Sequence, residues 1–431
     1  MKFYSTNNRN QLVSLQEAVV RGLASDQGLY MPERIPQLPA SFFDTLHKQS
    51  FQEIALAVAE AFIEGQIPHE EVKKIIAHTI SFDAPLVQIE KNIFSLELFH
   101  GPTLAFKDFG ARFMSHVLSH FAKQQKREVN VLVATSGDTG SAVANGFLGV
   151  PGTKVVVLYP SGKVSEIQEK QFTTLGQNIT AVEVNGTFDD CQRLVKQAFS
   201  DVDLNQKLFL TSANSINIAR LIPQAFYYFY AWSRLPKKEN IVVSVPSGNF
   251  GNLTAGLFAQ RMGLPIRHFV ASTNRNDIVP KYLMTGKFAP RHSVSTISNA
   301  MDVGNPSNLA RIQDLFHHNH LAMKRSVTGY SFSDDETRDT MKEVFKKAGY
   351  TMDPHGAIGY LGLKKYRSED PGGVGIFLET AHPAKFLEVV ESTLQTTVPV
   401  PDKLKSFLAR EKKTILCEAD FASFKKVIPG L

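Results

Sequence analysis

The feature that most constrains the fold of this chain is a pair of similar units, each with an apolar run, a glycine-containing loop and a helical segment. In the first unit, the β-branched run 129–134 precedes the loop 135–140 and a small-residue helix, 141–145. In the second, the run 241–245 precedes the loop 246–252 and another helix. Short apolar runs between turn signals are typical of buried strands. Both units therefore indicate strand, loop and helix in that order.

Both loops have the composition of an anion site. Glycine lets the backbone approach an anion closely, and a helix N-terminus presents unpaired N–H groups with a partial positive charge. Neither loop contains the Gly-x-x-x-x-Gly-Lys-Ser/Thr or Gly-x-Gly-x-x-Gly pattern of common nucleotide sites. One such loop can be an ordinary tight turn. Two in one chain indicate two phosphates, one on a cofactor and one on a substrate.

A lysine lies in an apolar segment upstream of both loops. Lys107 follows a Gly-Pro turn and has Leu104, Ala105, Phe106 and Phe109 as neighbours. An apolar environment lowers the pKa of an amine because it penalises the charged form, and a neutral amine can attack an aldehyde. A surface lysine whose stem covers apolar neighbours would have a similar sequence. The two phosphate loops favour the catalytic interpretation, in which this amine binds pyridoxal 5'-phosphate (PLP).

The rest of the chain alternates between strand and helix patterns. Apolar runs at 154–158, 180–184 and 373–378 are separated by helical segments, and the aromatic run 226–232 predicts a buried helix. This alternation predicts an α/β fold with mostly parallel, doubly wound sheets. Ligands bind such sheets at the carboxyl ends of strands, where both glycine loops and Thr380 would lie.

The first part of the chain has a different pattern. Ser14 and Glu17 have capping-box spacing ahead of a helix, and an amphipathic helix is predicted at 51–63, after a proline-rich piece. We therefore expect a mainly helical N-terminal domain, residues 1–83, followed by a catalytic region, residues 84–431.

Composition agrees with a globular protein of two or three domains. The 431 residues are 43% hydrophobic and 20% charged, with a formal net charge of +6. The basic residues are spread out and do not form the stripe that nucleic-acid binding needs, and no apolar stretch reaches the roughly 18 residues of a membrane helix. The N-terminus has no signal core, and the chain has only two cysteines. We expect a cytoplasmic protein with neither a nucleic-acid nor a membrane partner.

Segments that span most of the chain resemble the threonine synthases, in the longer branch of that family found in bacteria and fungi. That family belongs to the fold-type II PLP-dependent enzymes, together with tryptophan synthase β and the serine and threonine dehydratases. Residues 4–6 and 28–32 are similar to the family's N-terminal domain. The other matching segments, in the family's order, are 101–108, 134–141, 212–217, 246–252 and 380–386.

The resemblance implies two α/β domains around a cofactor cleft, the smaller and mobile one at about residues 110–215. It implies that Lys107 binds PLP and transfers protons between substrate carbons, and that the second glycine loop binds the PLP phosphate. Thr380 would meet the pyridine nitrogen, and Asp138 would lie near the ring's 3-oxygen. The implied cofactor-binding residues are Lys107, Gly248, Asn249, Phe250, Gly251, Asn252, Thr380 and Asp138.

The resemblance also implies a separate site for the phosphate of the substrate. Arg220 offers a planar guanidinium suited to phosphate oxygens, although an arginine on a helix surface would have the same sequence. The implied residues of this site are Ser136, Thr139, Asn214, Ser215, Asn217 and Arg220.

Other suggestive residues receive no chemical role. His317, His318 and His320 have no acidic or cysteine partner at ligand spacing, so no metal site is predicted. His355 and His382 fall in segments near the expected cleft, and neither is assigned a task.

The implied reaction converts O-phospho-L-homoserine and water to L-threonine and phosphate, by γ-elimination and β-addition of water. Lys107 would remove the α-proton and then a β-proton. The alternatives are a PLP-dependent phospho-lyase or a serine/threonine dehydratase of the same fold, or a phosphate-binding protein without catalysis. A dehydratase needs no second phosphate site, so Arg220 and Asn214 argue against it. The sequence does not predict oligomeric state or allosteric control.

Overall fold

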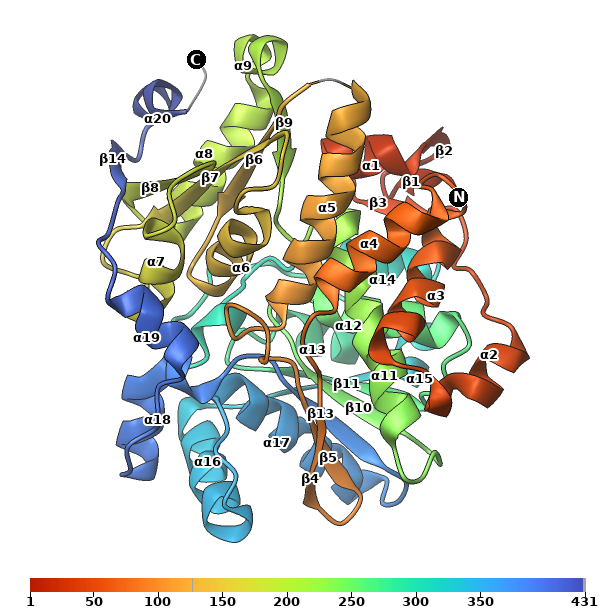
Figure 1. Ribbon diagram of the computed structural model, residues 1–431. Coiled ribbons are helices and arrows are strands. Elements are labelled where there is room, and N and C mark those ends of the chain that lie inside the picture. The colour runs from red at the N-terminus through yellow and green to blue at the C-terminus, as the bar shows by residue number, and fades with distance from the viewer. Residues whose placement is uncertain (126, 429–431) are drawn as a thin grey trace.

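The structure, a computed structural model, describes residues 1–125 and 127–428. Lys126 and residues 429–431, which end the predicted catalytic region, lie outside the described residues. The described chain forms one sheet of five strands, one of six and one of three. Figure 1 shows the five-stranded sheet above the six-stranded sheet, with the N-terminal helices at one side. The predicted α/β fold is confirmed.

The N-terminal region combines a small antiparallel sheet with helices. Strand β1 is central and pairs with β2 and β3. Helix α3 has the predicted bounds because Ser50 forms a capping box with Glu53 at its N-terminus. The elements are β1 (Phe3–Ser5), β2 (Asn8–Val13), α1 (Leu15–Arg21), β3 (Tyr30–Pro32), α2 (Ala40–Thr45), η1 (Leu46–Lys48), α3 (Phe51–Ile63) and α4 (His69–Thr79). The sheet was not predicted, since two of its strands have only three residues.

The five-stranded sheet is parallel throughout and has the order β14-β8-β7-β6-β9. Its central strands are apolar runs with the length expected for buried strands, and β6 has the predicted bounds. The strands are β6 (Val129–Ala134), β7 (Thr153–Pro160), β8 (Ile179–Asn185), β9 (Phe209–Ser212) and β14 (Ile415–Glu418). The helices that pack against it are α6 (Asp138–Phe147), α7 (Glu166–Thr173), α8 (Phe188–Ser200), α9 (Val202–Lys207) and α20 (Phe421–Val427).

The six-stranded sheet has the order β12-β11-β10-β13-β5-β4 and is parallel except for the β4–β5 pair. Its strands are β4 (Leu86–Glu90), β5 (Ile93–Glu97), β10 (Val242–Pro246), β11 (His268–Thr273), β12 (Val327–Ser331) and β13 (Gly375–Glu379). The remaining helices are α5 (Lys107–Gln125), α10 (Ile218–Leu221), η2 (Ile222–Ala225), α11 (Phe226–Arg234), α12 (Gly251–Arg261), α13 (Ile278–Thr285), η3 (Asn299–Met301), α14 (Leu309–Leu315), α15 (His320–Ser326), α16 (Asp334–Ala348), α17 (Pro354–Glu369), η4 (Pro383–Phe386), α18 (Leu387–Leu394) and α19 (Asp402–Leu408).

The C-terminal strand changes the predicted division of the chain. The sheet of the smaller unit extends beyond residues 110–215, because β14 pairs with β8 at its edge. In Figure 1 the end of the chain rises from α18 and α19 beside the larger sheet to β14 and α20 beside the smaller one. Residues 415–427 therefore belong with the smaller sheet, although the sequence placed them in the larger subdomain. The mobility of the smaller unit stays a prediction.

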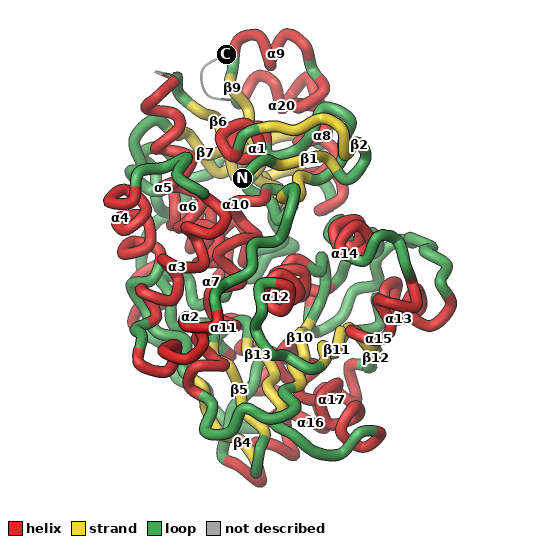
Figure 2. The backbone as a smooth tube through the Cα atoms, turned by 90° about the vertical axis from the view of Figure 1, so that its right-hand side faces the viewer, coloured by secondary structure: helices red, strands yellow, loops and turns green. Residues whose placement is uncertain are grey.

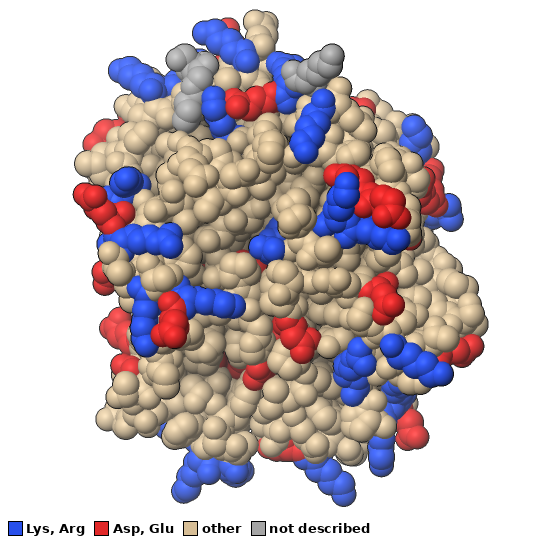
Figure 3. Space-filling view, in the orientation of Figure 1, with Lys and Arg blue, Asp and Glu red and all other residues tan. Residues whose placement is uncertain are grey.

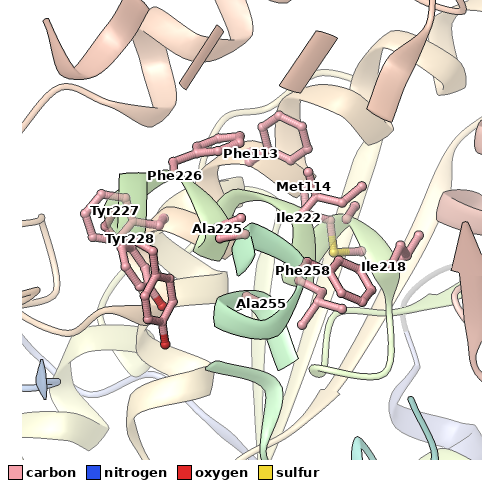
Figure 4. Packing of buried hydrophobic residues seen from close by; sticks show 14 of the residues in the cluster. Phe113, Met114, Ile218, Ile222, Ala225, Phe226, Tyr227, Tyr228, Ala255 and Phe258 are labelled. Atoms are coloured by element: carbon pink, nitrogen blue, oxygen red, sulfur yellow. The ribbon is translucent and has the colours of Figure 1, made fainter. Parts of the chain in front are cut away.

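A helical cluster lies beside the two sheets. Figure 4 shows side chains of α5, α11 and α12 meeting in one place, among them Phe113, Phe226 and Phe258. Burial of each such ring stabilises the fold by roughly 1.5–3 kcal/mol. The predicted aromatic helix is therefore core, as α11 shows.

The segments that were predicted to bind ligands follow directly after the carboxyl ends of strands. The segment with Lys107 follows β5, the first glycine loop follows β6, and residues 213–217 follow β9. The second glycine loop follows β10, and Thr380 follows β13. In Figures 1 and 2, α12 lies between the two sheets, so that the loop at its N-terminus sits where their carboxyl edges meet. This is the location expected for a ligand in doubly wound sheets.

The surface carries charge of both signs. Figure 3 shows basic and acidic side chains interspersed over one face, with uncharged surface between them. Within residues 1–125 and 127–428, no helix is both long and apolar enough to cross a membrane.

Candidate active site

Lys107 is the first residue of α5 and lies beside Thr380. Leu104 turns the chain with a left-handed φ of 57°. The Phe106 amide then donates to the Thr380 carbonyl at 2.9 Å, and Ala105 forms an isolated bridge with Ala381. These contacts join the segments that follow β5 and β13. They place the amine and the hydroxyl predicted to bind PLP at one edge of the sheet.

The Lys107 side chain is only 16% exposed. Burial lowers its pKa below the ordinary value for lysine, and the nearby cations Lys385 and Arg220 lower it further. The Asp138 carboxylate, 3.7 Å from Nζ, acts in the opposite direction. The net effect favours a neutral amine, which is the nucleophilic form.

Asp138 is the first residue of α6, and its carboxylate has three partners. Lys385 Nζ lies 2.6 Å from Oδ1, Gln168 donates to Oδ1 at 2.9 Å, and Lys107 faces Oδ2. Burial opposes ionisation, but the two lysines outweigh it and hold the pKa of Asp138 well below its usual range. Asp138 is therefore an anion paired with a buried cation. Sequence reasoning missed Lys385, although it lies in segment 380–386, five residues after Thr380.

The second glycine loop forms the N-terminus of α12. Phe250 adopts the left-handed region with φ 62°, a strained state for a bulky residue that occurs mainly at functional sites. A Cβ on Gly248 would lie 2.7 Å from Met301 Cα, so only glycine fits there. The Asn249 amide group is occupied by the Ser307 N–H and the Ser215 hydroxyl, at 2.6 Å each. These two bonds fix the Asn249 side chain, and the backbone N–H groups at the start of α12 are the main donors for a phosphate here.

Asn252 carries an unused donor in the first turn of α12. The hydroxyls of Tyr227 and Tyr228 each donate to Oδ1 at 2.7 Å, which fixes the orientation of the amide. Its Nδ2 is buried and has no acceptor within the described residues. A buried donor without a partner is costly, so the site is built for an acceptor that the polypeptide does not supply. Together with Lys107 and the Thr380 hydroxyl, this donor set fits PLP.

Arg220 is buried close to Lys107. Its Nη1 donates to the Ala213 carbonyl, and its Nε has no partner among the residues described. Burial lowers its pKa to about 10, against the pull of Asp108. No carboxylate of the described chain lies within 4.0 Å of this guanidinium. A buried cation without a counter-ion is unfavourable unless an anion binds to it.

Asn214, Ser136 and Thr139 lie around the ends of two adjacent strands. Asn214 Nδ2 donates to the Ala134 carbonyl at 3.0 Å, which ties the segment after β9 to the loop after β6. Ser136 and Thr139 are half-buried in that loop. The structure thus brings these three predicted residues into one region.

Ser215 lies between the two predicted phosphate sites. Its Oγ accepts from Asn249 Nδ2 at 2.6 Å and from Asn308 Nδ2 at 3.2 Å. Because both lone pairs are used, its own hydrogen is available for another acceptor. Arg311, which the sequence did not indicate, is fully buried and donates to the Ser215 and Ile216 carbonyls at 3.1 and 2.6 Å.

Asn217 differs from its predicted role. Its Oδ1 accepts from the Ala219 amide at 3.0 Å and caps α10. Its Nδ2 donates to the Val19 and Ser212 carbonyls at 2.8 and 3.1 Å. Both amide hydrogens are therefore used, and the side chain has none left for a phosphate. The sequence did not indicate the contact with Val19, because that residue belongs to the distant N-terminal region.

His355 and His382, which were assigned no chemical role from the sequence, both hydrogen-bond to neighbouring residues of the chain. Ala300 N–H donates to His355 Nε2 at 3.3 Å, so Nδ1 carries the proton and donates to Asp353 at 2.5 Å. This pair supports the segment on which Gly248 rests. His382 Nδ1 accepts from the Ala384 amide at 3.0 Å, and burial lowers the pKa of His382 to about 4. Within the described residues no cluster of ligands suited to a metal is found.

The amine that burial favours as neutral, and the backbone cradle beside it, make this a PLP-dependent enzyme of fold type II. The family model described as pyridoxal-phosphate dependent enzyme matches residues 81–378. Models of the threonine synthase N terminus and of the threonine synthase C-terminal region match residues 2–80 and 356–428.

Full-length relatives agree with these models. A threonine synthase of Haemophilus influenzae is 50% identical over 406 residues, 94% of each chain. The crystal structure of threonine synthase from Escherichia coli has a TM-score of 0.93 at 45% identity and covers 99% of each chain. A PLP-bound threonine synthase from Brucella melitensis has a TM-score of 0.92 at 34% identity, over 99% of this chain and 98% of that one. The chain belongs to the threonine synthase family.

Proposed function

We propose that this protein converts O-phospho-L-homoserine and water to L-threonine and phosphate, with PLP bound at Lys107. The observation that carries the proposal is the buried Arg220, which lies close to Lys107 and has no carboxylate within 4.0 Å among the residues that the structure describes. A dehydratase acting on serine or threonine has no substrate phosphate to neutralise this charge. The names of the relatives support the same reaction.

Lys107 is positioned to bind PLP and to move protons. Bound PLP withdraws electrons from the substrate carbons and so acidifies their protons. Once released from the cofactor, the amine can accept the α-proton and then a β-proton, and it can return a proton to the γ-carbon. Asp138, 3.7 Å away, stabilises the ammonium form between these transfers. One base beside these carbons is sufficient for the whole series of proton transfers.

The substrate phosphate is assigned to donors from two strand ends. Arg220 supplies the charge, and Ser136, Thr139, Asn214 and Ser215 supply neutral donors. Charge-assisted hydrogen bonds of a guanidinium to phosphate are strong in a buried site. Asn217 is not part of this assignment. We assign the cofactor phosphate to the backbone of Gly248–Asn252, and the pyridine nitrogen to Thr380.

We assign the protein to the cytoplasm, and the state of its two cysteines supports this assignment. Cys191 and Cys417 are both free and buried, and free thiols without disulfides are typical of a reducing compartment.

The reaction is tested by measuring both products. Wild type and Lys107→Ala are incubated with PLP and O-phospho-L-homoserine, and threonine and phosphate are quantified. Equimolar threonine and phosphate from wild type alone support the proposal. Phosphate with a keto acid would identify a phospho-lyase. No turnover by a protein that shows the visible absorption of bound PLP would refute this substrate and leave the PLP site intact.

A further inference from the structure

Lys385 is a second lysine in the site, and its environment is unusual. It lies in η4, and its side chain is completely buried. Its Nζ is 2.6 Å from Asp138 Oδ1 and donates to the Thr103 carbonyl at 2.9 Å. A buried ammonium group needs this kind of pairing. Both of its acceptors come from segments that contact Lys107.

Asp138 connects the two lysines. Oδ1 is bound by Lys385 and Gln168, while Oδ2 faces Lys107 Nζ at 3.7 Å. The three groups therefore alternate as cation, anion and cation. The other charged or titratable groups packed around them are Asp108 on α5, Arg220 on α10 and His382 beside η4.

The charges of this array have opposite effects on Lys107. A carboxylate alone at this distance would hold the amine in its protonated form, which is not a nucleophile. A cation on the far oxygen of the same carboxylate cancels much of that field.

We propose that Lys385 is a positioning residue that acts through Asp138: its ammonium group neutralises the carboxylate, so that Lys107 is available as a neutral amine to bind PLP. The inference rests on the PLP chemistry proposed for Lys107, and it does not depend on the identity of the substrate. It also accounts for an acidic residue near the predicted position of the 3-oxygen of PLP. The Asp138–Lys385 pair is neutral overall, as an asparagine would be.

The test follows the binding of PLP to the apoprotein by stopped-flow absorbance between pH 6 and pH 10. Lys385→Gln removes the charge and retains a side-chain N–H donor on a stem that is one bond shorter. We expect the pH at which the association rate is half-maximal to rise by about one unit or more, which corresponds to a roughly tenfold smaller neutral fraction of Lys107 at neutral pH. Lys364→Gln removes an exposed lysine of α17 as the matched control and should follow wild type. A Lys385→Gln profile that superimposes on wild type would overturn the proposal.

A second comparison does not require Lys385→Gln to fold on its own. Asp138→Asn leaves the charge of Lys385 uncompensated, whereas Asp138→Asn with Lys385→Gln leaves a neutral pair. We expect the profile of Asp138→Asn to lie about one unit or more below that of the double variant, since Lys385 still disfavours a proton on Lys107. Coincident profiles would refute the inference. Neither comparison uses substrate, so a failure of the product assay would not affect this result.

Discussion

Replacement of Glu379 by glutamine should stabilise the protein more at neutral pH than at acidic pH. Glu379 ends β13 and is fully buried. Neither of its carboxyl oxygens, nor Asp353 Oδ2, has a donor within the described residues. Burial, and then the neighbouring Asp353 and Glu97, raise the pKa of Glu379 well above its usual value. This direction favours a protonated Glu379 carboxyl group beside Asp353 in the folded protein.

The sign and size of the effect follow from proton linkage. The folded state holds a proton that the unfolded state loses near pH 4.5. The stabilisation is complete below that pH and is lost as the pH rises toward the folded pKa. While the pH stays below the folded pKa, this stabilisation decreases by roughly 1.4 kcal/mol for each pH unit. Glutamine has no proton to lose, and its amide can still donate to Asp353.

The measurement is the free energy of unfolding in urea at pH 5.5, 6.5 and 7.5, followed by circular dichroism. The difference between Glu379→Gln and wild type should grow in favour of the variant at each step of this range, by at most about 3 kcal/mol in total. Glu388→Gln, on the exposed side of α18, is the matched control and should show no such trend. A difference that is the same at all three pH values would refute the protonated state of Glu379.

Two further changes probe the anion sites. Gly248→Ala adds a Cβ that would lie 2.7 Å from Met301 Cα, so the loop must shift; PLP should bind at least about tenfold more weakly in a fluorescence titration, and unchanged affinity would contradict the assigned cradle. Arg220→Met removes the buried cation assigned to the substrate phosphate; kcat/KM for O-phospho-L-homoserine should fall about 100-fold or more with the PLP absorption retained. Arg261→Met, at an exposed arginine, should leave kcat/KM within about twofold, and an equal loss there would contradict the assignment.

Local sequence patterns predicted the parts of the fold that local forces determine. The run 129–134 became β6 with the same bounds, because a short, mostly apolar stretch rich in valine favours a buried strand. The aromatic run became α11, and the glycine loop became the start of α12. The apolar environment of Lys107 could also be predicted from the sequence, since its apolar neighbours are adjacent in the chain.

Contacts between segments that are distant in the chain could not be predicted from the sequence. Lys385 meets Asp138 only because the loops after β13 and β6 face each other. Asn217 is occupied by Val19, and β14 returns from the C-terminus to pair with β8. The partner of a buried polar group depends on tertiary packing, which has no periodicity along the sequence. The pairing of Asp138 with Lys385 is such a contact between distant segments.

The most direct test of the proposed reaction is the fate of solvent oxygen. The reaction is run with O-phospho-L-homoserine in water labelled with ¹⁸O, and both products are analysed by mass spectrometry. Elimination of phosphate followed by addition of water predicts one ¹⁸O atom in the hydroxyl of threonine and no label in the phosphate at the moment of release. Labelled phosphate accompanied by homoserine would show simple hydrolysis of the ester and would contradict the proposed reaction.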